Sequence, residues 1–130
     1  MTQHTLFVCA LCRFSETERE RDGISGGQHL LNSLSADLET HDHAFQLHPV
    51  RCMGACGRSC VVAFVAAHKL TFVFSDLPPL EAAPDLLQFS HQYLTHPTGT
   101  VPHRERPESI RKNLLVVLPP APTSPQAWIL

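Results

Sequence analysis

The sequence lacks the features of several large protein classes. It has no run approaching the roughly 18 consecutive apolar residues of a membrane-spanning helix. Lys and Arg do not outnumber Asp and Glu, and the formal net charge is −2. We therefore expect no binding to nucleic acid or to a membrane, because such binders carry a basic surface. The first residues show no basic segment followed by a long apolar one, so we expect no secretory signal and a cytoplasmic protein.

Motifs of common enzyme classes are also missing. We find no Ser-His-Asp pattern of a hydrolase and no paired catalytic carboxylates. Gly23, Gly26 and Gly27 fit neither GxGxxG nor GxxxxGK[ST], so no phosphate-binding loop is predicted. The acidic side chains from Glu16 to Asp22 alternate with arginines, which is typical of a solvent-exposed segment. These patterns favour a metal-binding protein or an electron carrier over an enzyme.

What is present fits one compact α/β domain. The chain has 130 residues, of which 43% are hydrophobic and 17% charged, as is ordinary for a globular protein. Prolines gather beyond Gly99, which predicts a domain over residues 1–100 and a Pro-rich C-terminal extension over residues 101–130. The apolar run 114–118 in this extension either packs on the domain or adds a strand to the sheet of another copy.

Hydrophobic patterning predicts a small central sheet with two helices packed on it. Apolar or alternating runs predict strands at 5–9, 44–50, 61–66 and 70–74, and a 3.6-residue period predicts helices at 28–40 and 85–95. Residues 10–27 are predicted to be a loop. The last two strands are close enough in sequence to form a hairpin. The predicted order is therefore β-α-β-β-β-α.

The five cysteines fall into two groups. In a cytoplasmic protein they are more consistent with metal binding or redox chemistry than with disulfides. Cys9 and Cys12 follow the first predicted strand, whereas Cys52, Cys56 and Cys60 follow the second. If the two strands are parallel, a right-handed crossover brings their ends to the same edge of the sheet, and the two groups become neighbours. An antiparallel arrangement would separate them.

Thiolates gathered in a small volume repel one another, and a metal cation offsets this repulsion. Thiolate ligands select zinc, copper(I) or iron–sulfur centres, and four cysteines suit both a tetrahedral zinc ion and a 2Fe–2S cluster. Gly54 and Gly57 favour the cluster modestly, because exposed backbone N–H groups near sulfur tune its potential. Thiol–disulfide exchange by Cys9 and Cys12 is less consistent, since the predicted helix begins too late to lower a thiol pKa.

The segment Cys52-Met53-Gly54-Ala55-Cys56, followed by an apolar strand, resembles the second ligand loop of thioredoxin-like 2Fe–2S ferredoxins. Residues 6–120 resemble more closely a group of small bacterial predicted metal-binding proteins of unknown function. The segments that carry this resemblance are Leu6-Phe7-Val8-Cys9 with Cys12-Arg13, Cys52 to Ala63, Thr71 to Phe74 with Asp76-Leu77, and Arg104-Glu105-Arg106-Pro107.

The resemblance implies a thioredoxin-like fold, a 2Fe–2S centre, a redox partner protein and a homodimer. Carried over, Cys52 and Cys56 form the second ligand pair, and Cys9 and Cys12 are the candidates for the first. The family usually separates its first pair by more residues, and Cys60 is surplus to four ligands. Either Cys12 or Cys60 is therefore spare, and Cys9, Cys52, Cys56 and Cys60 remain an alternative set. The expected function is ferredoxin-like electron transfer; the alternative is a cysteine-ligated zinc-binding or metal/tetrapyrrole-trafficking protein.

Overall fold

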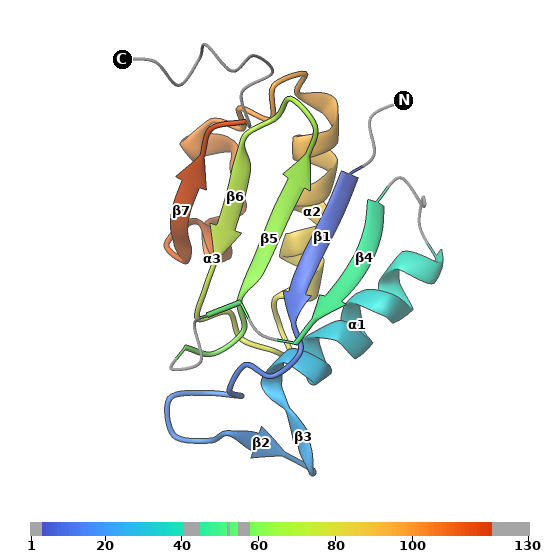
Figure 1. The fold of residues 1–130 in the computed structure, drawn as a ribbon, viewed down its shortest axis with the longest axis vertical. Helices are drawn as coiled ribbons and strands as arrows, with labels where there is room; N and C mark the ends of the chain where they lie inside the picture. Colours follow the sequence, from blue (N-terminus) through green and yellow to red (C-terminus); the bar gives the residue numbers. More distant parts are fainter. Residues whose placement is uncertain (1–3, 41–44, 52, 55–57, 121–130) are drawn as a thin grey trace.

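A computed structural model describes residues 4–40, 45–51, 53–54 and 58–120 of the chain. Its centre is a five-stranded sheet with the strand order β4-β1-β5-β6-β7 (Figure 1). These strands are β1 (His4–Cys9), β4 (Phe45–Val50), β5 (Val62–Ala66), β6 (Thr71–Phe74) and β7 (Leu114–Leu118). β1 and β4 pair in parallel, whereas β1–β5, β5–β6 and β6–β7 pair antiparallel. A short hairpin of β2 (Glu20–Arg21) and β3 (Ile24–Ser25) lies beyond one end of the sheet.

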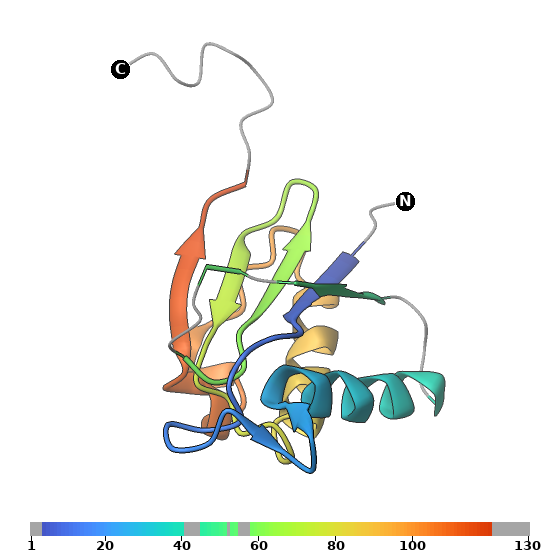
Figure 2. The ribbon, with the colours of Figure 1, turned by 60° about the horizontal axis from the view of Figure 1, so that its bottom comes forward.

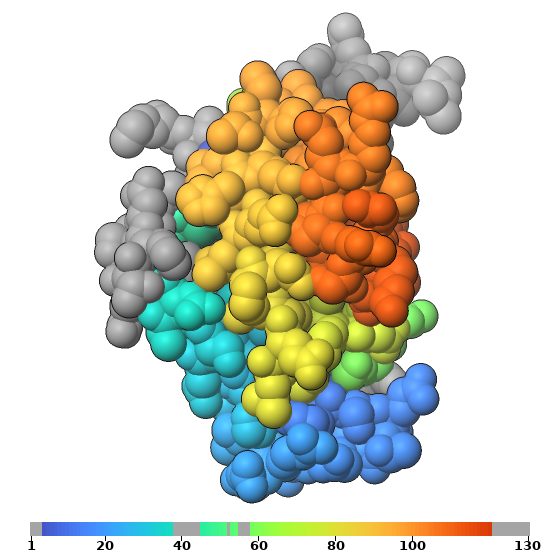
Figure 3. Space-filling view, turned by 180° about the vertical axis from the view of Figure 1, so that it is seen from behind, coloured from blue at the N-terminus to red at the C-terminus, as the bar shows by residue number. Residues whose placement is uncertain are grey.

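The two long helices are α1 (Gly26–Thr40) and α2 (Ala83–Thr95), and the short ones are η1 (His103–Glu105) and α3 (Glu108–Arg111). α1 and α2 bury their apolar stripes in one core together with alternate residues of the strands, so both cover the same face of the sheet. Figure 2 shows this two-layer arrangement, and Figure 3 shows α1 and α2 side by side over that face. Among the residues described, no helix has the length and apolar character needed to cross a membrane.

Aromatic side chains form the centre of this core. Phe64, Phe72, Phe89 and Tyr93 are fully buried, and the ring centroids of Phe64 and Phe89 lie 4.9 Å apart in an edge-to-face contact. The hydroxyl of Tyr93 donates a 2.7 Å hydrogen bond to the carbonyl of Leu70, which satisfies the polar end of the ring. The aromatic contacts therefore join α2 to β5 and β6.

The structure confirms the predicted strands and both long helices to within two residues. The predicted loop at 10–27 is wrong in part, because it contains the β2–β3 hairpin and the first two residues of α1. α2 likewise begins two residues early, with Pro84 in its first turn, where proline needs no hydrogen-bond acceptor. The apolar run 114–118 pairs with β6 of the same chain.

We predict that Phe64→Ala lowers the free energy of unfolding by about 3–5 kcal/mol, because it removes a ring from a closely packed core. Urea denaturation followed by circular dichroism measures this change. Leu80→Ala is the matched control, since Leu80 is 55% exposed and its truncation opens no cavity. Equal loss of stability in the two variants would contradict the assigned core.

Candidate metal centre

The ends of β1 and β4 meet at one edge of the sheet. Cys9, the last residue of β1, is the register partner of Val50, the last residue of β4. Beyond this pair, the backbone N–H of Ala10 donates a 2.8 Å hydrogen bond to the carbonyl of Val50. The two strands are therefore parallel, as the expected meeting of the two cysteine groups requires, and their ends lie side by side (Figure 1).

The start of β5 reaches the same edge from the opposite direction. The backbone N–H of Cys9 donates a 3.0 Å hydrogen bond to the carbonyl of Val61. Beyond the ends of the named strands, Arg13 and Ser59 form an isolated parallel bridge. The segment that joins β4 to β5 therefore begins beside Ala10, at Val50, and ends beside Cys9 and Arg13, at Val61 and Ser59. This joining segment carries the second cysteine group in the sequence.

Three of the five predicted site residues lie within the described part of the chain, and the structure brings them to this edge. Cys9, Cys12 and Cys60 are all buried free cysteines. Cys9 and Cys12 pack with Val61 in a small apolar group, and the partly buried side chains of Met53 and Val73 pack against it. Cys60 belongs instead to the main core. Cys52 and Cys56 lie outside the described residues.

Burial controls the ionisation of these thiols. It is the main reason that the pKa of Cys12 lies far above its ordinary value, and a hydrogen bond and the charge of Cys9 act in the same direction. Burial also raises the pKa of Cys60 to about 12, against a smaller opposing effect of its own backbone N–H. Both thiols are consequently protonated at neutral pH unless a cation stabilises the thiolate. Low-pKa nucleophilic chemistry does not fit these two side chains.

The N-terminus of α1 packs directly beneath the Cys9–Cys12 segment. The backbone N–H of Gly27 donates a 3.2 Å hydrogen bond to the carbonyl of Cys12. A Cβ atom on Gly27 would overlap the carbonyl oxygen of Cys9, so only glycine permits this approach. The helix therefore begins beside the Cys9–Cys12 segment, and its first residue lies two residues before the predicted start at Gln28.

Ser25 is a site residue that the sequence analysis missed. Its Oγ accepts a 3.1 Å hydrogen bond from the backbone N–H of Gln28, which makes Ser25 the N-cap of α1. The segment Ser25-Gly26-Gly27-Gln28 matches the S-x-x-Q form of a capping box, a signal that would have placed the start of the helix correctly. The two glycines obscured it because they are poor helix formers.

The described residues do not by themselves complete a metal site. Across 4–40, 45–51, 53–54 and 58–120, no group of three or more His, Cys, Asp or Glu side chains is arranged to hold a metal ion. The three described thiols therefore do not form a set that binds metal without further ligands, and the complete predicted set includes Cys52 and Cys56.

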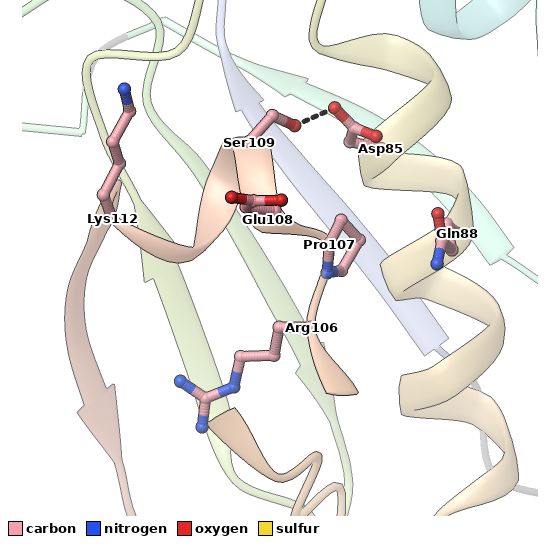
Figure 4. Close-up of a pocket in the computed structure, with 7 residues that line it drawn as sticks. All are labelled: Asp85, Gln88, Arg106, Pro107, Glu108, Ser109 and Lys112. Atoms are coloured by element: carbon pink, nitrogen blue, oxygen red, sulfur yellow. Dashed lines mark hydrogen bonds between the residues drawn. The ribbon is translucent and has the colours of Figure 1, made fainter. Parts of the chain in front are cut away.

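A cavity of about 670 Å³ lies away from the cysteines, between α2 and the segment that contains α3. Its polar side chains do not converge on a common point. Figure 4 shows the Ser109 hydroxyl hydrogen-bonded to Asp85, while Arg106 and Lys112 extend in different directions away from that pair. Arg106 instead holds the fold together, because it donates a hydrogen bond to the carbonyl of Val101 and lies over the ring of Phe72. The cysteine edge is therefore the stronger candidate site.

The structure predicts how the thiols react in the metal-free protein. We expect iodoacetamide to leave Cys12 and Cys60 unmodified in the folded chain at about pH 7.5, because alkylation needs an exposed thiolate. Modification becomes faster as the pH rises toward the raised pKa values, and it is complete in denaturant. Peptide mass spectrometry measures the labelling at each cysteine. Rapid labelling of Cys12 in the folded protein would contradict its burial.

Comparisons with known proteins give a family and a fold. The model of the family described as "Protein of unknown function (DUF1636)" matches residues 6–120. The chain is similar in structure to a thioredoxin-like [2Fe-2S] ferredoxin from Aquifex aeolicus, with a TM-score of 0.55 and 16% sequence identity, over 92% of this chain and 96% of that one. The comparison with curated proteins gave no match. The predicted thioredoxin-like ferredoxin fold is confirmed.

Proposed function

The chain belongs to the DUF1636 family, and we propose that it binds a 2Fe–2S cluster through cysteine thiolates and carries single electrons. The observation that carries this proposal is the convergence of the two cysteine-bearing segments at the edge where β1 and β4 end. A 2Fe–2S cluster supplies one-electron chemistry when bound, and the protein sets its potential and its access.

The proposed ligands are Cys9, Cys12, Cys52 and Cys56. Met53, which directly follows Cys52 in the chain, packs against the apolar side-chain group formed by Cys9, Cys12 and Val61. This contact supports a shared site for the two cysteine groups. Apolar side chains around the thiols would limit the access of water to a bound group.

The chemistry of the buried thiols also supports a metal centre. Burial is the main cause that raises the pKa of the Cys12 thiol, and its hydrogen bond to Cys9 and the charge of Cys9 raise it further. A cation bound between the two thiols reverses this effect, because it stabilises both thiolates at once. The structural neighbour is named as a [2Fe-2S] ferredoxin, which favours a cluster over a single zinc ion for a chain of the same fold.

Cys60 is proposed as a core residue instead of a ligand. It is fully buried and packs in the main core with Val62 and other apolar side chains of the sheet. A cysteine in such a position behaves as a small apolar residue. The alternative ligand set contains Cys9, Cys52, Cys56 and Cys60. The variants described below exclude or establish this set.

The proposal is tested by the metal content and spectra of the full chain purified without oxygen. We expect about two irons and two acid-labile sulfides per chain and a rhombic EPR signal after reduction with dithionite. Colourless protein with one tightly bound zinc would establish the alternative zinc-binding function and overturn the cluster.

Cysteine variants identify the ligands. We expect Cys12→Ser, Cys52→Ser and Cys56→Ser each to lose most of the iron or to change the EPR signal, because each removes one thiolate. Cys60→Ala is the matched control and keeps the iron content and spectrum of the unchanged chain. Full iron and an unchanged spectrum in Cys56→Ser, or loss of the cluster in Cys60→Ala, would refute this ligand set.

We further propose that two copies of the chain associate along β7. β7 is the outermost strand on one side of the sheet. It exposes a run of apolar side chains, namely Leu115, Val116, Val117 and Leu118. An exposed apolar edge strand is a template for pairing with another strand. Light scattering coupled to size-exclusion chromatography should give a dimer for the unchanged chain and a monomer for Val116→Lys, with Lys112→Ala as control. A monomer before any substitution would reject this pairing.

A further inference from the structure

We infer that Ser25 is a positioning residue, which holds the Cys9–Cys12 segment against the N-terminus of α1 and thereby sets the stability and potential of the bound centre. The inference rests on the proposed function, since it concerns the same site. It assigns a role to a side chain outside every cysteine motif in the sequence.

The first step of the argument is the pair of hydrogen bonds made by one hydroxyl group. Ser25 Oγ donates a hydrogen bond to the carbonyl of Ala10, which lies between the two cysteines of the first group. The same oxygen accepts a hydrogen bond from the backbone N–H of Gln28. Ser25 therefore joins the cysteine segment to the first turn of α1 through a single half-buried side chain.

The second step is the close packing on either side of this hydroxyl. The backbone N–H of Gly27 donates to the carbonyl of Cys12. Cβ atoms on Gly26 or Gly27 would overlap the backbone at Arg13 and Cys9 respectively. The helix end and the cysteine segment are therefore in direct backbone contact, and Ser25 supplies the side-chain bond that holds this contact in register.

The third step is electrostatic. The N-terminal end of an α-helix carries roughly half a positive elementary charge, and α1 has 15 residues. This end lies against the backbone that carries Cys9 and Cys12. A cluster held by four thiolates is anionic, and one-electron reduction makes it more negative. A helix end at this place therefore stabilises the reduced state more than the oxidised state and raises the reduction potential.

The test compares iron release and potential in variants of the full chain that carry the cluster. We expect Ser25→Ala to release iron to a chelator about tenfold faster, the order of effect seen when a partner of a metal ligand is removed. We also expect its reduction potential to become more negative. Ser25→Thr restores both values, because threonine keeps the hydroxyl group and the cap.

Two further variants separate positioning from folding. Ser90→Ala is the matched control, because Ser90 is a buried serine on α2 whose hydroxyl donates to the carbonyl of Leu86, and it should leave both values unchanged. Ser25→Gly keeps most of the capping effect but lacks the hydroxyl. Ser25→Gly should therefore show the faster iron release and the more negative reduction potential expected of Ser25→Ala. This test remains informative even if Ser25→Ala folds poorly.

The outcomes distinguish the two proposals. If the unchanged chain carries no iron–sulfur cluster, the proposed function fails and this inference fails with it. If the unchanged chain carries the cluster and Ser25→Ala and Ser25→Gly both keep its release rate and potential, the inference alone is overturned. The same is true if Ser90→Ala shifts the potential as far as Ser25→Ala does.

Discussion

The parallel pairing of β1 with β4 is the constraint on which the candidate site depends. Parallel neighbours end at the same edge of a sheet, and here the last residues of both strands are register partners. β5 then returns from that edge between β1 and β6. Three segments that are distant in sequence consequently meet around Cys9, and the described cysteines Cys9, Cys12 and Cys60 all lie in these segments.

Burial gives this edge its chemical character. Thiols that are removed from water do not ionise readily, so Cys12 and Cys60 are poor nucleophiles in the described fold. The same property suits metal ligands, because a bound cation replaces the lost hydration of the thiolate. Cys12 packs in the small apolar group at the strand ends, whereas Cys60 packs in the main core, so two similarly buried thiols have different surroundings.

Much of the fold could be predicted because its elements carry regular apolar patterns. The strong periodicity of α1 and the β-branched residues of β5 are local signals that tertiary contacts reinforce. The β2–β3 hairpin escaped prediction because each of its strands has only two residues, too few for a period. The first turn of α1 escaped because Gly26 and Gly27 serve a close backbone contact at the expense of helix propensity.

The sequence by itself determined the order of the two long helices and of strands β1, β4, β5 and β6, the apolar faces and the division of the cysteines into two groups, since all of these are local in the chain. Tertiary structure alone decided that Cys60 joins the main core and that Ser25 reaches the carbonyl of Ala10. Spacing along the chain does not encode such contacts. They arise only when packing brings the helix end, the strand end and the returning strand into one volume from which water is excluded.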